Sequence, residues 1–487
     1  MSPLAARSLV FFTSAAVLVM EILAGRLLAP YVGVTLETFT GIIGTVLAGI
    51  SLGAWVGGRL ADRHPPQRLL GPALIIGGIL VLVAPTIVAV IGPALTGGGP
   101  IEIVTLAAVG FFAPALVLST VTPIVAKVTL DDLAETGAVV GGLSAVATAG
   151  AIFGTFVTGF VLVAALPSRP IVLCVGVALV IVGAIMAVRA GRLGPPRLAG
   201  VVALTLIGTA MLAVVSGPCQ FETAYFCAKV TVDESRESGR LLWLDTLRHS
   251  YVDLNDPSYL DFRYARLMAD TVLTHSPEGP LDALYIGGGG FTLPRWLTAE
   301  RPGSTNTVLE LDASLVDIAE DELGLDPGDI DVITLGDARL NILPTPDNHF
   351  ELVVGDAFGG LSVPWHLTTE EFVTEIAARL TDDGLYVMNL IDHPPFRFAR
   401  AEAATLAAVF PEVLVMAPPA YIDGVRGGNV VLAAGWRPFN TAELERAIAD
   451  RAGSEIALTG AAAAEWIGDS PTLTDEFAPV DQWISRS

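Results

Sequence analysis

The chain is poor in lysine and in positive charge. Only two of its 27 basic residues are lysines, Lys127 and Lys229, and 50 aspartates and glutamates give a net charge of −23. Residues 1–217 hold ten basic and seven acidic residues, whereas residues 218–487 hold seventeen and forty-three. So acidic a segment repels phosphates, which excludes nucleic acid as a partner. An acidic, lysine-poor surface favours adaptation to high salt, although a GC-rich genome also replaces lysine with arginine.

Motifs of several enzyme classes are also absent. The sequence contains no Walker loop, no Gly-x-Ser-x-Gly motif and no Cys/His spacing typical of a metal site, so we expect no metal. Cysteine is rare, with three residues. Cys174 falls within an apolar run, whereas Cys219 and Cys227 follow the last such run. These two either form a disulfide, which would suit an oxidising compartment, or remain free thiols.

Long hydrophobic runs, by contrast, fill the first part of the chain. Hydrophobic residues make up 52% of the sequence, which is more than an ordinary soluble protein contains. The first run is too long for a cleaved signal peptide, so we expect a retained helix. A helix that crosses a bilayer needs about 20 apolar residues. Seven runs meet this length and predict a multi-pass cell-membrane domain, 1–217, with the lipid bilayer as its partner: 8–30, 38–58, 69–92, 101–126, 137–165, 170–188 and 198–216.

The positions of arginine and lysine predict the orientation of these helices, because positive loops favour the cytoplasmic side. One side of the predicted bundle has only Arg169, and the other has Arg7, Arg59, Arg63, Arg68, Lys127, Arg189, Arg192 and Arg197. The N-terminus is therefore predicted to be cytoplasmic. With seven spans, the acidic part of the chain would then lie outside.

Charged residues within predicted spans mark either polar sites or ion pairs between helices. Glu21 and Arg26 lie on roughly the same side of the first helix, and Glu37 begins the second. One interpretation is a polar site that admits a substrate into the membrane. The other is a structural ion pair, and the sequence leaves both open.

The pattern changes after residue 217. Residues 218–270 alternate as a small β-rich region does and continue into a connecting helix. Residues 271–487 alternate apolar strands with amphipathic helices, which is typical of a parallel, doubly wound, Rossmann-like sheet. Five strands are expected here: 282–287, 305–312, 330–338, 350–358 and 384–392.

Glycines and acids follow successive strands of this domain. Residues 287–290 are four glycines between a strand and a helix, where a backbone without side chains can approach a ligand closely. Glu310 ends the next strand, and Asp337 and Asp356 follow the two after it. A carboxylate in the position of Glu310 can accept both hydroxyls of a ribose. Together the four features indicate a nucleoside-binding, methyltransferase-like fold.

At these residues the chain resembles the spermidine synthase (polyamine aminopropyltransferase) family in its membrane-bound form. The resemblance rests on "YIGGGGFTLPRWL", "VLELDASLVDIAEDEL", "ITLGDARLNI", "LVVGDAFGGLSVPWH" and "LTDEFAPVDQW", and on "EILAGRLLAPYVG" in the apolar half. It implies aminopropyl transfer from decarboxylated S-adenosylmethionine to an amine. It also implies roles for particular residues: nucleoside binding for Gly287, Gly288, Gly289, Glu310 and Asp337, and proton acceptance from the amine for Asp356.

The amine side departs from the family pattern. Gly359 replaces the second aspartate of the family's D-x-x-D motif, and Gly290 replaces the aspartate of its G-G-G-D motif. Tyr264 stands where the resemblance places a histidine. A polyamine with two ammonium groups needs several carboxylates to compensate for lost hydration, so binding of putrescine is in question.

Other polar residues near strand ends are candidates to replace these groups. His366 and His393 are each a candidate base. For His366 the alternative is that it only helps to set the helix that follows it. Four acids either bind the amine or lie on a solvated surface: Asp253, Asp256, Asp261 and Asp392.

Three functions follow from these observations. The first is a membrane-anchored aminopropyltransferase. The second is an S-adenosylmethionine-dependent methyltransferase on the same fold, which the loss of the amine-side acids favours. The third is a polyamine or nucleoside sensor or transporter without turnover. A homodimer is left open. The side of the membrane on which the soluble domain lies is also left open, because S-adenosyl nucleosides are made in the cytosol whereas the charge bias favours the outside.

Overall fold

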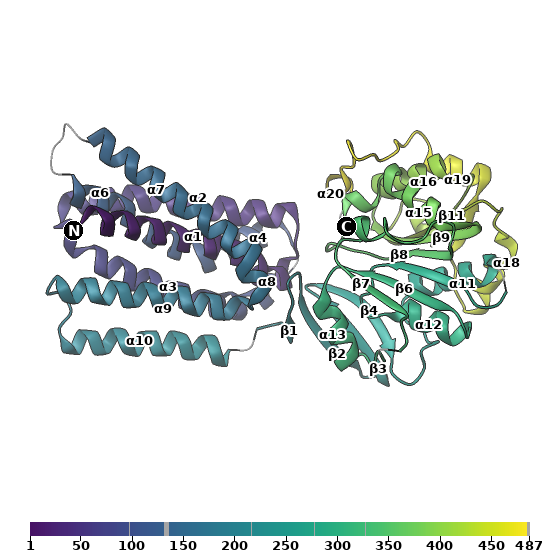
Figure 1. Ribbon diagram of the computed structural model, residues 1–487, viewed down its shortest axis with the longest axis horizontal. Coiled ribbons are helices and arrows are strands. Elements are labelled where there is room, and N and C mark those ends of the chain that lie inside the picture. The colour runs from purple at the N-terminus through teal and green to yellow at the C-terminus, as the bar shows by residue number, and fades with distance from the viewer. Residues whose placement is uncertain (97, 131–135, 216, 277, 327, 485–487) are drawn as a thin grey trace. The chain divides into compact units, whose positions relative to one another are not determined.

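A computed structural model describes residues 1–96, 98–130, 136–215, 217–276, 278–326 and 328–484 (Figure 1). The chain divides into two compact units, Met1–Lys229 and Val230–Ser487. The first unit is helical apart from its last residues. The second contains an eight-stranded sheet with helices on its faces.

Within the described residues, seven helical segments of the first unit are long and apolar enough to cross a membrane. Each overlaps one of the seven predicted runs, and all but the fifth and the seventh extend beyond their runs at both ends. The segments are Pro3–Val32, Leu36–Arg63, Pro66–Ala94, Pro100–Thr129, Thr136–Ala165, Ser168–Arg189 and Pro195–Val214. They contain the helices α1 (Pro3–Val32), α2 (Leu36–Arg63), α3 (Leu70–Ile91), α4 (Pro100–Ala107), α5 (Ala113–Ser119), α6 (Val121–Thr129), α7 (Thr136–Val157), α8 (Val163–Ala165), α9 (Ser168–Arg189) and α10 (Pro195–Val214).

Small residues allow these helices to approach one another closely. Gly150 and Gly154 of α7 face α1, and a Cβ atom at either position would overlap a backbone carbonyl oxygen, that of Phe11 or of Ala15. Helix α3 packs in a similar way against α9. Helix packing therefore explains the glycines at these contacts.

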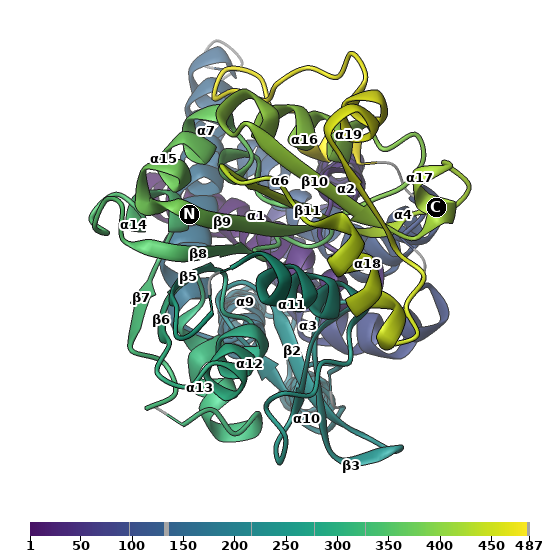
Figure 2. The ribbon, with the colours of Figure 1, turned by 90° about the vertical axis from the view of Figure 1, so that its right-hand side faces the viewer.

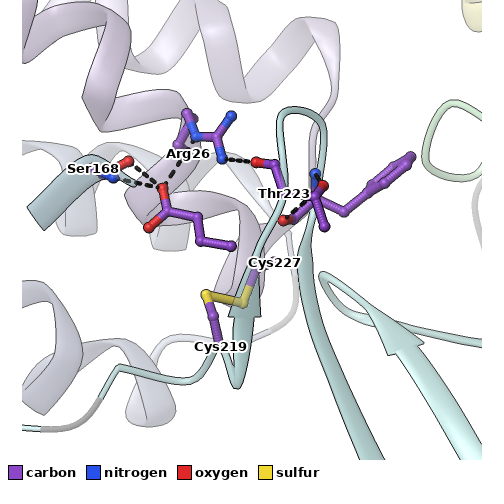
Figure 3. Close-up of a disulfide and its surroundings, with 7 residues drawn as sticks. Arg26, Ser168, Cys219, Thr223 and Cys227 are labelled. Atoms are coloured by element: carbon purple, nitrogen blue, oxygen red, sulfur yellow. Dashed lines mark hydrogen bonds and ion pairs between the residues drawn. A yellow bond between two sulfur atoms is a disulfide. The ribbon is translucent and has the colours of Figure 1, made fainter. Parts of the chain in front are cut away.

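For the charged residues of α1 the sequence left two interpretations open, a polar site in the membrane and an ion pair between helices. Arg26 binds Glu222, with 3.2 Å between Nε and Oε1, and donates to the carbonyl oxygens of Thr223 and Ala224 (Figure 3). The backbone N–H of Ser168, at the start of α9, also donates to Glu222 at 3.0 Å. This contact is an ion pair, but it joins α1 to strand β1, 196 residues away, and not to another helix as the structural interpretation expected.

The segment that contains Glu222 is closed by a disulfide between Cys219 and Cys227 (Figure 3). It forms β1 (Phe221–Glu222) and the start of β2 (Cys227–Asp233), which pair antiparallel. With β3 (Arg236–Leu244) and β4 (Leu247–Asp253) they make a four-stranded sheet in the order β1-β2-β3-β4. The small β region expected from residue 218 is thus present, and α11 (Arg263–His275) follows it.

The large sheet has the strand order β12-β10-β11-β9-β8-β5-β6-β7. Five neighbouring strands are parallel: β7 (Val332–Leu335), β6 (Thr305–Glu310), β5 (Asp282–Ile286), β8 (Phe350–Gly355) and β9 (Leu380–Asp392). The other three pair antiparallel: β11 (Gly428–Gly435), β10 (Glu412–Ala417) and β12 (Ile456–Thr459). The five strands predicted from the sequence are thus the parallel ones, and the sequence analysis did not predict these three, which make the sheet mixed.

Helices cover both faces of this sheet, as a doubly wound fold requires (Figure 2). Phe372 and Ile376 of α15 (Glu370–Arg379) and Phe398 and Leu406 of α16 (Arg397–Val409) are fully buried in one core with β8 and β9. The remaining helices are α12 (Thr292–Glu300), α13 (Ala313–Glu322), α14 (Ala338–Asn341), α17 (Pro419–Ile422), α18 (Thr441–Asp450), α19 (Gly460–Ile467) and α20 (Val480–Trp483).

Candidate functional site

The predicted site residues meet at the carboxyl edge of the parallel strands. Residues 287–290 follow β5, Glu310 ends β6, Asp337 follows β7 and Asp356 follows β8. Because β7, β6, β5 and β8 are neighbours, these four positions lie side by side at one edge of the sheet. Ligands of open parallel sheets bind at this edge.

Glu310 holds the glycine turn in place. Its side chain is almost completely buried, and Oε2 accepts hydrogen bonds from the backbone N–H groups of Gly288 at 2.8 Å and Gly289 at 3.1 Å. Oε1 accepts from Asp312 N at 2.8 Å. Burial raises the pKa of Glu310 above its usual value, and the three backbone donors oppose that shift. A carboxylate has about four acceptor positions, so in this state three are filled and one is left for a ribose hydroxyl.

The turn itself requires glycine. Gly287 and Gly289 have φ angles of +95° and +51°, in the left-handed region that disfavours side chains. A Cβ at Gly287 would lie 2.7 Å from the carbonyl oxygen of Asp356, so the turn packs directly on the backbone after β8. A Cβ at Gly290 would lie 2.7 Å from Cβ of Ser250. The family's aspartate has no room at Gly290, because Ser250 fills that space and accepts a hydrogen bond from Gly290 N.

Asp337 lies at the N-terminus of α14, and its Oδ1 accepts a hydrogen bond from Arg339 N at 2.8 Å. His366 Nε2 lies 3.0 Å from Asp337 Oδ2, while the backbone carbonyl of His366 accepts from Arg339. The imidazole therefore faces the nucleoside-side acid Asp337. This placement does not bring His366 to Asp356, for which the resemblance implies the role of proton acceptor. His366 is therefore not placed to act there as a second base.

Asp356 is the acid best placed for proton transfer. Its Oδ2 accepts a hydrogen bond from the Tyr264 hydroxyl at 3.2 Å, and its Oδ1 accepts from Asn389 Nδ2 at 3.0 Å. Loss of hydration raises the pKa of Asp356 to about 6, although both hydrogen bonds act to lower it. The pKa of Tyr264 is also raised, first by burial and then by the negative charge of Asp356. A carboxyl that titrates near neutrality is suited to accept a proton from an amine.

Two residues of this site escaped the sequence analysis. Asn389, in the middle of β9, is buried and links Asp356 to Asn429 of β11 through its side-chain oxygen. The signal that could have found Asn389 is its position as a polar residue inside the apolar run "VMNLID". His249 of β4 lies beside the glycine turn, with Nδ1 2.9 Å from Ser250 Oγ. The sequence around His249 gave no signal of a site, because His249 belongs to the small sheet and reaches the glycine turn only in the folded structure.

A pocket brings the glycine turn, Asp356 and Tyr264 together. It is also lined by His249, Tyr285 and Asp261. Of the four candidate acids, only Asp261 lines it. The others have structural partners: Asp253 and Asp256 pair with Arg236, and Asp392 accepts from backbone N–H groups at the start of α16. Gly359 lies exposed on the loop after β8, where its N–H donates to the Ser362 carbonyl oxygen.

Comparison with known proteins finds similar sequences and one similar structure. No family model matches the chain. A polyamine aminopropyltransferase from Vibrio vulnificus is 31% identical over 160 residues, which cover 31% of this chain and 50% of that protein. A probable polyamine aminopropyl transferase from Bifidobacterium longum is 29% identical over 161 residues, covering 33% of this chain and 35% of the other. The chain thus spans half or less of the length of these relatives.

A solved structure agrees with the fold. The crystal structure of a probable spermidine synthase from Corynebacterium glutamicum superimposes with a TM-score of 0.50 at 26% identity, over 53% of this chain and 97% of that one. The fold of the second unit is therefore a Rossmann-like fold similar to that of this probable spermidine synthase. More particularly, the chain is similar over these segments to polyamine aminopropyltransferases and to a probable spermidine synthase.

Proposed function

We propose that this protein is a membrane-anchored aminopropyltransferase that uses decarboxylated S-adenosylmethionine and an amine acceptor as substrates. The observation that carries the proposal is Asp356. Its carboxyl has a pKa of about 6, lies against the Tyr264 hydroxyl and shares a pocket with the glycine turn. An exposed structural acid would have none of these three properties.

The proposed reaction is a single displacement at carbon. The acceptor nitrogen attacks the methylene carbon next to the sulfonium, a C–N bond forms and the C–S bond breaks. The electron pair of the broken bond goes to sulfur, which leaves as methylthioadenosine. The ionised carboxylate of Asp356 orients the amine and takes the proton that the amine loses. Tyr264 and Asn389 hold both oxygens of that carboxylate in place.

The nucleoside would occupy the neighbouring part of the same sheet edge. Glu310 would accept a ribose hydroxyl while it keeps the turn closed through Gly288 and Gly289. Asp337 follows β7, which β5 and β6 separate from β8 and Asp356, and it would lie near the base. The close packing of Gly287 on Asp356 would set the sulfonium next to the carboxylate.

Methyl transfer from S-adenosylmethionine is the second candidate. Asp356 is compatible with it, since a methyl acceptor loses a proton in the same way. The observation that favours it is the absence of a carboxylate at Gly290 and Gly359, where the resemblance expects two acids. A sensor or transporter would use the same pocket for binding without turnover.

We further propose that the bilayer holds the first unit and that the soluble domain lies outside the cytoplasm. The described residues contain seven helical segments that could cross a bilayer, and an odd number of spans would take the chain from a cytoplasmic N-terminus to the opposite side. The Cys219–Cys227 disulfide, which follows the last of them, suits an oxidising compartment. The site would then receive its nucleoside from outside the cytoplasm.

Binding of the nucleoside tests this proposal on the full-length protein in lipid nanodiscs at high salt. Calorimetry should give micromolar binding of decarboxylated S-adenosylmethionine, tighter than that of S-adenosylmethionine. The variant Glu310→Gln should bind at least tenfold more weakly, because it loses the charge that orients the turn and the ribose. Tighter binding of S-adenosylmethionine would favour methyl transfer. No binding of either nucleoside by folded protein would contradict both transferase functions.

A further inference from the structure

The amine side of the pocket offers few negative charges. Among the residues that the structure describes, two carboxylates line it, Asp356 and Asp261. The two positions where the family resemblance expects further acids are glycines, and at Gly290 the Ser250 side chain leaves no space for one. The number of ammonium groups that this pocket can receive therefore depends on Asp261.

Asp261 already has a cationic partner. Arg248 Nη2 lies 3.5 Å from Asp261 Oδ2, and the Arg248 guanidinium lies over the ring of Phe262, 5.4 Å from its centroid. Asp261 and Phe262 both line the pocket. A second ammonium group approaching Asp261 would thus meet the positive charge of Arg248, and the pair presents no net charge to it.

The rest of the lining is neutral. Loss of hydration lowers the pKa of His249 to about 4, so its imidazole is uncharged at neutral pH. Tyr285 is 2% exposed, and its hydroxyl has no hydrogen-bond partner within the described part of the chain. Leu293 and Pro294 add apolar surface, and the other lining side chains, Ser250, Tyr251, Ala265, Thr292 and Val354, carry no cationic or anionic group. These groups suit an uncharged part of a ligand, with one hydroxyl available to it, but not a second cation, whose loss of hydration would be uncompensated.

We propose that the acceptor is an amine with a single ammonium group and an uncharged tail, rather than a diamine such as putrescine. The inference rests on the proposed function, because it assigns the acceptor of that same site. The one ammonium group pairs with Asp356, which has no cationic partner among the described residues. The tail lies along Tyr285, Leu293 and the Arg248–Asp261 pair.

Two amines of equal length test this assignment: 1-aminobutane and 1,4-diaminobutane, each with decarboxylated S-adenosylmethionine and the full-length protein. Release of methylthioadenosine gives kcat/KM for each. We expect 1-aminobutane to have at least a tenfold higher kcat/KM. An equal or higher value for the diamine would overturn the assignment while leaving aminopropyl transfer intact. Release with neither amine, from protein that is folded, would contradict the proposed function itself.

A pair of variants isolates the role of Arg248. Arg248→Ala frees the charge of Asp261 and should raise kcat/KM for the diamine about tenfold relative to the monoamine. Arg248 is half exposed, so this change should leave folding intact. The double variant Arg248→Ala/Asp261→Asn should return the ratio to that of the wild type. An unchanged ratio in Arg248→Ala would show that the ion pair does not set the preference, and would overturn this step.

Discussion

The two halves of the candidate site differ in how their acids are held. In the nucleoside half, defined by residues 287–289, Glu310 and Asp337, the acids accept hydrogen bonds from backbone N–H groups. In the amine half, defined by Asp356, Tyr264, Asn389 and Asp261, side chains alone hold the acids. Backbone donors keep the nucleoside half fixed by the fold, whereas the amine half can change with single substitutions.

The difference accounts for where the chain departs from the family pattern. Replacing Glu310 would leave two N–H groups of a strained turn without an acceptor, which is costly in a buried position. Gly359 is exposed, and a Cβ there would meet only Pro364 and Ser362 at 3.8 and 3.9 Å. Its family counterpart could therefore be lost without structural cost. In the proposed function, the nucleoside half would be constrained by the fold, and the amine half would set the acceptor.

The largest effect is expected for Asp356→Asn, which removes the proton acceptor. Transfer should fall by about 10³-fold, within the range seen for general bases. Melting temperature should not fall. The pKa of Asp356 is raised on folding, so its contribution to stability is present below about pH 4 and lost as pH rises to about 6. The asparagine of the variant is uncharged at pH 7, so the variant does not lose this contribution to stability. Asp382→Asn, at an exposed acid, is the matched control, and equal losses in both variants would contradict the role of Asp356.

The next effect concerns the nucleoside half. Gly287→Ala should reduce transfer about 10²-fold, because its Cβ would displace the Asp356 backbone and because the residue has a positive φ. Gly424→Ala, also at positive φ but with open space around its Cβ, separates the displacement from strain alone. Comparable activity losses in the two variants would mean that the turn does not position Asp356.

A smaller effect is expected in the pH dependence. Transfer needs ionised Asp356, so kcat/KM should rise through about pH 6 and then level off. Tyr264→Phe removes a hydrogen bond to the carboxylate, so the rise should move to higher pH and the maximal rate should fall about tenfold. Tyr225→Phe, at an exposed tyrosine, should leave the profile unchanged. If the pH profile of Tyr264→Phe were identical to that of the wild type, Tyr264 would not influence the pKa of Asp356.

The smallest effect is expected for Gly359→Asp, which restores the second acid of the D-x-x-D pattern. It should improve the use of 1,4-diaminobutane about threefold relative to 1-aminobutane, through attraction across a partly solvated loop. Gly359→Asn has the same shape without the charge and should have no such effect. If both variants change the ratio equally, loop shape rather than charge controls the preference.

The sequence predicted those parts of the fold that depend on local patterns. Long apolar runs located the seven helical segments, and strand-end acids located the parallel half of the sheet. The antiparallel β10, β11 and β12 were missed because strand direction depends on which strands pair in space. Contacts between distant residues escaped for the same reason: Arg26 pairs with Glu222, and His249 reaches the glycine turn from a different sheet.

The central claim is tested most directly by the products of one reaction. Full-length protein in nanodiscs is supplied with decarboxylated S-adenosylmethionine and 1-aminobutane, and mass spectrometry follows methylthioadenosine and the aminopropylated amine. Equal amounts of both products from the wild type, and about 10³-fold less from Asp356→Asn, are the predicted result. Neither product from the wild type, or the same yield from Asp356→Asn, would contradict aminopropyl transfer at this site.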